Sequence, residues 1–327
     1  MDNQLRPMTL GEILDRTAEL FRNHFVLFAG ISAVFAGTML LTEMLHLGGL
    51  MLLGYPHIPP HLEWAYAVSL GAEALAVALV AGLSIAAFNR VVAWIYLGEP
   101  VTIRAAAGSI FSRLRRYLWL MTVTMFRAWT PLFVLYVVLF AILFAVMPSG
   151  FLFNPQVARQ PHPQDAAKLV AAGVAMLIVA PLILLAVVYG VFMWLRYSLA
   201  MPACVVEDLP VGKAIKRSIE LSQGSRGRIF VLWILVYAVR LLLGILVGFP
   251  FIILGFKHPG QALPLAWLAL SQVGGFVTNT MIGPIYSTGL TLFYYDQRIR
   301  KEGFDIEWMM RAAGLAPPQG LAAPQET

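Results

Sequence analysis

"LVAAGVAMLIVAPLILLAVVYGVFMWLRY" begins at Leu169 and ends at Tyr197, and Arg196 is its only charged residue. The apolar stretch continues to Val206. A helix that crosses a bilayer needs about 20 mostly apolar residues. This stretch is longer than that, so it predicts a transmembrane helix.

The composition of the whole chain agrees with this prediction. Of the 327 residues, 59% are hydrophobic and 12% are charged, and the mean hydropathy is +0.76. Soluble domains are about half apolar and about a quarter charged. We therefore expect an all-α, polytopic membrane protein with a single membrane domain over residues 1–310 and a disordered tail over 311–327. Stretches of membrane-spanning length lie at 25–45, 64–96, 117–147, 169–206, 229–256 and 263–295, which predicts six transmembrane helices.

Lysine and arginine residues are distributed unevenly between the two sides of this predicted bundle. One side carries only Arg159, Lys168 and Lys257. Positively charged residues in short connections mark the cytoplasmic side. We therefore expect a multi-pass protein of a bacterial plasma membrane with both termini in the cytoplasm. The basic residues assigned to the cytoplasmic side are Arg6, Arg16, Arg22, Arg104, Arg113, Arg115, Arg116, Lys213, Lys216, Arg217, Arg226, Arg228, Arg298, Arg300, Lys301 and Arg311.

The pattern G-x-x-x-x-R-[T/S]-x-E-L occurs twice, each time shortly before an apolar stretch. Both copies lie on amphipathic segments, which is typical of helices in the lipid headgroup plane, with the arginine toward the headgroups. A third amphipathic segment, Pro100 to Tyr117, shares only the general pattern. We therefore predict three repeat units, 8–97, 98–206 and 207–300, each with one interfacial helix and two spans. The motif residues are Gly11, Arg16, Thr17, Glu19 and Leu20 in the first copy and Gly212, Arg217, Ser218, Glu220 and Leu221 in the second.

Capping residues predict where these interfacial helices start. Thr9 and Glu12 have the spacing of a capping box before the first copy. Asp208 is the candidate N-cap before the second copy. The stretch from Pro148 to Lys168 is rich in proline and polar residues, which predicts an extracytoplasmic loop or lid.

Four arginines lie inside predicted spans: Arg90, Arg127, Arg196 and Arg240. Each is about 12–18 Å from the nearest cytoplasmic end of its helix, so they should form a belt at one depth. An arginine in a span usually faces the bundle interior or a polar cavity. Two interpretations stay open: the belt binds an anionic group such as a lipid phosphate, or it reaches toward headgroups and exposed carbonyls. Glu43 and Glu73 are the candidate counter-charges, nearer the outer face.

The sixth stretch is the most polar. Gln272 and Asn279 are its candidate site residues, beside Thr278 and Thr280. Interrupted, polar spans often mark transport sites. Its glycines and Pro284 permit close helix packing or an unwound turn, and close helix packing is the simpler interpretation.

Familiar catalytic motifs are absent from the sequence, which counts against an ordinary hydrolase or a nucleotide-driven pump. His46, His57, His61 and Glu63 lie in one connection but lack fixed zinc-ligand spacing, so an exposed loop is the simpler interpretation. We expect no cofactor and no metal. Lone Cys204 excludes an intrachain disulfide.

Three stretches carry a resemblance to a known family: "LRPMTLGEILDRTAELFRNHF", "PVGKAIKRSIEL" and "LTLFYYDQRIRKEGFDIEWM". With them the chain resembles the glycerophosphoryl diester phosphodiesterase membrane domain and the related YciC-like bacterial membrane proteins. The likeness runs from Leu5 to about Met310, and Tyr294 to Phe304 is its most specific part. The catalytic barrel of fused relatives is missing. The resemblance therefore implies a membrane module associated with lipid headgroup metabolism and no catalytic residues.

These observations lead to a first functional hypothesis: a non-enzymatic membrane scaffold or accessory subunit that interacts with anionic lipids. Its partners would be inner-leaflet lipids and a membrane or enzyme partner protein, with no nucleic acid. The alternative is a transporter or channel for a lipid-like or anionic solute. A third hypothesis is an intramembrane hydrolase acting on lipid phosphodiesters, for which Glu73 near the histidine connection is the only candidate.

Overall fold

The computed structural model describes residues 6–52, 54, 59, 62–96, 98–146, 163–257 and 265–312. In these ranges every regular element is a helix, as predicted. The helices are α1 (Leu10–Asn23), α2 (Phe25–Leu52), α3 (Glu63–Tyr96), α4 (Ile103–Phe111), α5 (Leu114–Val146), α7 (Pro163–Tyr197), α8 (Ala200–Val206), α9 (Val211–Ser222), α10 (Arg226–Lys257), α11 (Leu265–Glu302) and α12 (Phe304–Ala312).

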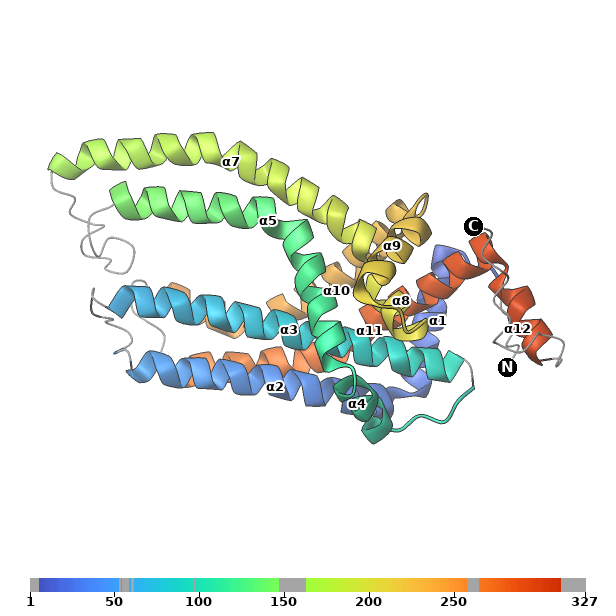
Figure 1. Ribbon diagram of the computed structural model, residues 1–327. Helices are drawn as coiled ribbons and strands as arrows, with labels where there is room; N and C mark the ends of the chain where they lie inside the picture. The colour runs from blue at the N-terminus through green and yellow to red at the C-terminus, as the bar shows by residue number, and fades with distance from the viewer. Residues whose placement is uncertain are drawn as a thin grey trace.

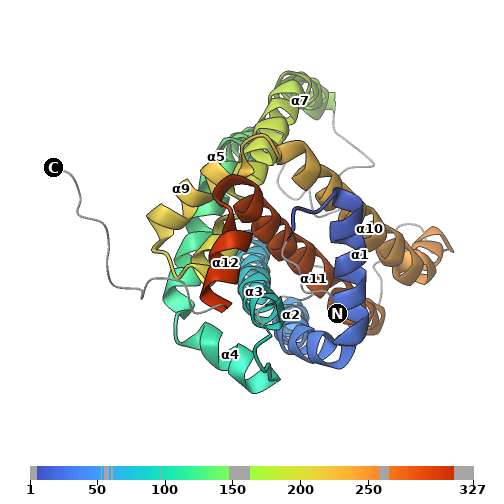
Figure 2. The same cartoon turned by 90° about the vertical axis from the view of Figure 1, so that its right-hand side faces the viewer.

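The long helices run side by side, and the short helices gather toward one end (Figure 1). We call this the inner end and the opposite end of the long helices the outer end. Figure 2 looks onto the inner end, where α1, α4 and α9 lie on different sides of the bundle. The short helices therefore cover the same end of the long ones.

Five helices are long and apolar enough to cross a membrane in the part of the chain that the structure describes. They are Phe25–Leu52, Trp64–Tyr96, Leu114–Ile142, Val170–Val206 and Arg226–Leu254. The sixth predicted stretch forms α11, a 38-residue helix with more polar residues, which is not among the five. The fold is all-α and compatible with an integral membrane protein.

The first helix starts as predicted and the ninth does not. Thr9 accepts a hydrogen bond from the backbone of Glu12, and the Glu12 carboxylate accepts one from the backbone of Thr9 at 2.7 Å, which completes the capping box. The predicted N-cap Asp208 is wrong: Pro210 is the N-cap of α9 and makes no side-chain capping bond. The Asp208 carboxylate pairs with Arg113 and Arg116 instead, so it ties the turn before α9 to the start of α5.

The apolar stretch that begins at Leu169 does not stay one helix to Val206. It breaks between α7 and α8, at Ser198 and Leu199. Pro202 has no backbone N–H to donate to the carbonyl four residues before it, which weakens the helix there. Ser218 of the second motif copy stabilises the break, because its hydroxyl accepts from the Leu199 N–H at 3.1 Å and donates to the Arg196 carbonyl at 2.9 Å.

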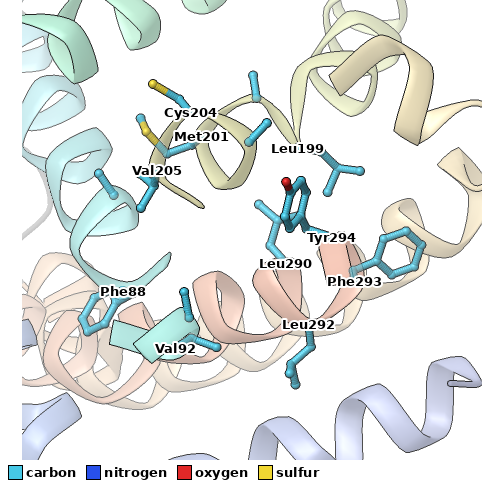
Figure 3. Packing of buried hydrophobic residues seen from close by; sticks show 14 of the residues in the cluster. Phe88, Val92, Leu199, Met201, Cys204, Val205, Leu290, Leu292, Phe293 and Tyr294 are labelled. Carbon is cyan, nitrogen blue, oxygen red and sulfur yellow. The ribbon is translucent and has the colours of Figure 1, made fainter. Parts of the chain in front are cut away.

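The buried core lies toward the inner end. Most of its residues come from α1, the first half of α2, the second half of α3, α4, the start of α5, α8, α9, the start of α10 and the second half of α11. Figure 3 shows Tyr294 and Leu290 of α11 beside Leu199, next to α8 with Met201, Cys204 and Val205. These helix ends are packed as in a soluble domain.

Asp296 of α11 holds three parts of the chain together at the inner end. Its side chain is fully buried. It accepts from the Met8 N–H at 2.8 Å, pairs with Arg228 of α10 at 3.2 Å, and pairs with Arg300 at 3.0 Å. Both arginines also donate to the Met8 carbonyl. We call these residues the Asp296 cluster.

A second ionic group joins α8, α9 and α11. Arg217 of the second motif copy donates to Glu207 at 3.1 Å and to Glu302 at 2.7 Å. Tyr294 donates to Glu207, and Arg298 pairs with Glu302 at 3.2 Å. We call these residues the Glu207 cluster.

The outer halves of the helices are packed far less densely. Many large apolar side chains there are exposed, such as Leu177 at 76% and Leu184 at 67%, and such residues suit a lipid surface. Nearer the inner end, α5 and α7 pack closely at Gly190, where a methyl group would lie 2.7 Å from the ring of Trp129. The two helices therefore contact each other through a glycine.

Two predicted segments lie partly outside the described residues. α7 begins at Pro163, so the end of the predicted loop is helical, and 147–162 are outside the description. α12 includes the first two residues of the predicted tail, and 313–327 are outside as well.

Candidate functional site

A cavity of about 640 Å³ lies between the central parts of α2, α3, α5, α7, α10 and α11. Small-molecule sites in proteins are typically about 300–1,000 Å³ and mostly apolar, with a few placed polar groups. The walls of this cavity fit that description. They carry aromatic and aliphatic side chains, including Trp129, Trp194 and Trp233, with Arg240, Asn279 and Glu43 as the main polar groups.

Arg240 and Asn279 form a pair on one wall. Arg240 of α10 donates to the side-chain oxygen of Asn279 on α11 at 3.0 Å. The backbone carbonyl of Asn279 accepts a hydrogen bond from the Ser32 hydroxyl of α2 at 3.2 Å, so three helices meet at this residue. Among the described residues no carboxylate pairs with Arg240, whose only hydrogen-bond acceptor is a neutral amide. The guanidinium is therefore a cation held on the cavity wall and available to an anion.

Glu43 lies on the same cavity, toward the outer end of α2. Its side chain is hydrogen-bonded to Gln272 of α11. It also interacts electrostatically with the side chains of Glu73 and His46. His46 and Glu73 approach each other at 3.3 Å, and their side chains are only 11% and 20% exposed. The acidic end of the cavity is thus built by α2, α3 and α11.

The other three arginines of the predicted belt do not line the cavity. Arg90 lies over Trp94 at 5.9 Å and 3.4 Å from the hydroxyl of Tyr117. Arg127 is exposed, and Arg196 is half-buried beside the α7–α8 break. The structure brings only Arg240 to the cavity, while the common depth of all four stays a prediction.

The predicted polar residues of the sixth stretch, Gln272 and Asn279, face the two charged groups of the cavity. α11 is continuous through its glycines and Pro284, so no unwound turn occurs there. Gly283 packs against Ser32 and Gly289 against Leu232, where a methyl group would lie 3.2 Å and 3.1 Å away. Glycine here permits close helix packing, as the simpler interpretation predicted.

The two motif copies differ in their contacts. Arg16 pairs within α1, with Glu19 at 2.6 Å. Arg217 pairs with Glu207 and Glu302, while its predicted orientation toward headgroups stays a prediction. Gly11, Gly212 and Glu220 are exposed. The motif therefore marks helix position, and its charged residues are used differently.

Charge pairing shifts the pKa values in the Glu207 cluster. Burial alone lowers the pKa of Arg217, but Glu302 and Glu207 outweigh it and raise that pKa. Burial alone raises the pKa of Glu302, but Arg217 and Arg298 outweigh it and lower that pKa. The pair is therefore ionised at neutral pH.

Sequence reasoning missed the Asp296 cluster and the cavity itself. An aspartate inside "FYYDQRIR", followed by two arginines, was the available signal for the cluster. The cavity left no local signal, because its walls come from six separate helices.

The histidine connection stays largely untested. His57 and His61 are outside the described residues, and nothing is described of the Glu63 side chain. Within the described part of the chain, no group of three His, Cys, Asp or Glu residues could hold a metal ion.

Comparison with known proteins gives one match. No curated protein and no solved structure matches the chain. A family model described as a domain of unknown function (DUF7847) matches residues 8–297, which include the cavity and both motif copies. The chain therefore belongs to the DUF7847 family.

Proposed function

We propose that this protein binds an amphiphile with an anionic group, such as a phospholipid, inside the membrane. One observation carries the proposal: Arg240 lies in the middle of a membrane-length helix, on a cavity wall, with a neutral partner. A charge at this depth is costly, and such residues usually serve a ligand or a polar pathway. Arginine binds phosphate and carboxylate groups through two parallel hydrogen bonds.

The remaining walls suit the apolar part of such a molecule. Phe35 and Met39 from α2, Val77 from α3, and Val187 and Val191 from α7 all line the cavity. Tyr237 of α10 is also on the wall and is 54% exposed, so the cavity reaches the surface of the bundle on that side. A lipid chain could enter from the bilayer there.

The membrane arrangement that accompanies this proposal has six spans, with α11 as the sixth. The three units would be α1 to α3, α4 to α8, and α9 to α11. Their interfacial helices α1, α4 and α9 lie at the same end of the bundle (Figure 2), which supports the grouping. The inner end carries most of the basic residues, which supports its placement in the cytoplasm of a bacterial cell, together with both termini.

We propose a non-enzymatic role as a scaffold or accessory subunit that keeps bound lipid near a membrane or enzyme partner protein. The resemblance to the glycerophosphoryl diester phosphodiesterase membrane domain supports lipid headgroup metabolism as the setting. This resemblance rests on the repeated G-x-x-x-x-R-[T/S]-x-E-L motif and on the stretch from Tyr294 to Phe304.

A transporter of a lipid-like or anionic solute is the second candidate. The cavity favours it, because its polar residues lie at the centres of the long helices rather than at their ends. Proteoliposomes separate the two roles. Movement of a headgroup-labelled phospholipid between leaflets that is lost with Asn279→Ala favours transport, and retention of lipid without movement favours the accessory role.

Lipid retained after purification tests the binding proposal. We expect Arg240→Gln to lower the phospholipid retained per protein about tenfold, because a hydrogen bond to a charged group contributes about 1.5–3 kcal/mol. Arg127→Gln is the matched control, since Arg127 is exposed and off the cavity. Equal retention by wild type and Arg240→Gln, with both variants folded, would overturn the proposal.

A further inference from the structure

The cavity carries two ionisable groups of opposite sign that do not pair with each other. Arg240 donates to Asn279, and Glu43 is hydrogen-bonded to Gln272. Both neutral partners are on α11, separated by about 10 Å of helix. The positive and the negative group therefore occupy different levels of one cavity.

The end of the cavity near Glu43 brings two carboxyl groups and one imidazole together. His46 lies 3.3 Å from Glu73. Glu43 is hydrogen-bonded to the neutral side chain of Gln272, so among the residues that the structure describes Glu43 has no cationic side chain of its own. Glu43 is the one that lines the cavity. A carboxylate on an apolar wall is costly unless a cation or several donors meet it.

The chemistry of this end favours an ammonium group over a metal ion. Glu43 is the only carboxylate among the cavity-lining residues that the structure describes. A calcium ion takes about six to eight oxygen ligands. An ammonium group needs one carboxylate and a few acceptors, and it is also attracted to the faces of tryptophan rings such as those on these walls.

We propose that the ligand is a zwitterionic amphiphile, with its anionic group at Arg240 and Asn279 and a primary ammonium at Glu43. This inference rests on the proposed lipid-binding function and adds the headgroup class. A phosphoethanolamine headgroup carries a phosphate and a primary ammonium joined by a two-carbon link. Placed between Asn279 and Gln272, which are about 10 Å apart along α11, it offers one charge to each end of the cavity. A headgroup with only negative charge satisfies Arg240 but leaves Glu43 without a cation.

Purified protein and three defined phospholipids with identical chains test this. The probes are phosphatidylethanolamine, its N-acetylated form, which keeps the phosphate but loses the ammonium, and phosphatidylglycerol. Bound lipid is counted by mass spectrometry of the intact complex. We expect wild type to bind phosphatidylethanolamine about tenfold more tightly than the other two, since a charged hydrogen bond contributes about 1.4 kcal/mol or more.

Two variants test which residue causes the preference for phosphatidylethanolamine. Glu43→Gln should bind all three lipids at the level at which wild type binds phosphatidylglycerol, so only the preference is lost. Arg240→Gln should weaken binding of all three about tenfold. Glu99→Gln is the control, because Glu99 is exposed and outside the cavity. Unchanged thermal unfolding of Glu43→Gln shows that the bundle is intact.

The possible failures are distinguishable. If wild type binds none of the three lipids, the proposed function falls and this inference with it. If wild type binds all three equally, or if Glu43→Gln keeps the preference, the zwitterion inference is overturned while lipid binding stands. An equal loss of all lipids in Glu43→Gln also overturns it, because the residue then acts on the cavity as a whole.

Discussion

The inner and outer halves of this bundle are held together by different forces. At the inner end, Asp296 is fully buried with two arginines and a backbone N–H, and the surrounding core excludes solvent. Farther from that end, the central parts of six helices enclose a cavity of about 640 Å³, and the outer halves carry many exposed apolar side chains. The inner end therefore fixes the arrangement of the helices, while the central and outer parts leave space for a ligand.

The Asp296 cluster should give the largest effect on stability. Asp296→Asn removes the negative charge that Arg228, Arg300 and the Met8 N–H share. Breaking a buried ion pair costs about 3–5 kcal/mol, and the partial exposure of both arginines favours the lower value. Thermal unfolding in detergent, followed by tryptophan fluorescence, measures this. Asp15→Asn on the exposed face of α1 is the control, and an equal midpoint for the two variants would contradict the role of the cluster.

A methyl group at the α5–α7 contact should give the next largest effect. Gly190→Ala brings a methyl group within 2.7 Å of Trp129 and 3.3 Å of the Ala128 carbonyl. Overpacking of this kind costs about 1–3 kcal/mol. Gly173→Ala in the same helix has nothing within 4 Å, so it should be neutral or stabilise by up to about 1 kcal/mol. Thermal unfolding of the two variants checks this, and equal effects would show that α5 and α7 are not closely packed at Gly190.

Arginine substitutions in the two motif copies should destabilise the protein to different extents. Arg217→Gln loses contacts with Glu207 and Glu302 and should destabilise by about 1.5 kcal/mol. Arg16→Gln loses one pair within its own helix, which is worth about 0.2–0.5 kcal/mol. Thermal midpoints measured side by side test this order. A larger effect for Arg16 would mean that α1, rather than α9, is the better-anchored copy.

The smallest expected effect is a pH dependence from Glu302. Its pKa is lower in the folded protein than its ordinary value, so pairing stabilises the fold above about pH 4.3 and this contribution is lost as the pH falls through the folded pKa. The pair is partly exposed, so the contribution should be below about 1 kcal/mol. We expect Glu302→Gln to have a lower thermal midpoint than wild type at pH 7, and the difference to shrink toward pH 3. A constant difference would contradict this.

The helix boundaries were predictable where the signal was local. The capping box at Thr9 and Glu12 needs only residues three apart, and it is confirmed. Asp208 had the right residue type for an N-cap but is used by Arg113 and Arg116, which are far away in the sequence. The break before α8 depends likewise on Ser218, which reaches it from α9. A distant partner overrode the local pattern in both cases.

The candidate site was predictable only in part. Arg240, Asn279, Gln272 and Glu43 were recognisable one by one, because polar residues are costly in apolar stretches. The sequence did not predict that these residues form a positive and a negative group on one cavity. It also did not predict that Arg90, Arg127 and Arg196 lie outside this cavity. These relations depend on how each helix is rotated about its axis, and the long apolar helices show almost no sidedness in their composition.

The sequence by itself determined that the chain is all helical, that several helices are long and apolar enough for a membrane, and where its costly charges lie. Length and hydropathy are properties of each segment alone, so no partner is needed to specify them. Only the tertiary structure decided which helices touch, that Asp296 joins the N-terminal segment to α10 and α11, and that Arg240 and Glu43 line the same cavity. Those facts come from packing, hydrogen bonds and ion pairs between residues such as Arg240 and Asn279, 39 positions apart, or Arg228 and Asp296, 68 positions apart, whose geometry exists only after the helices have assembled.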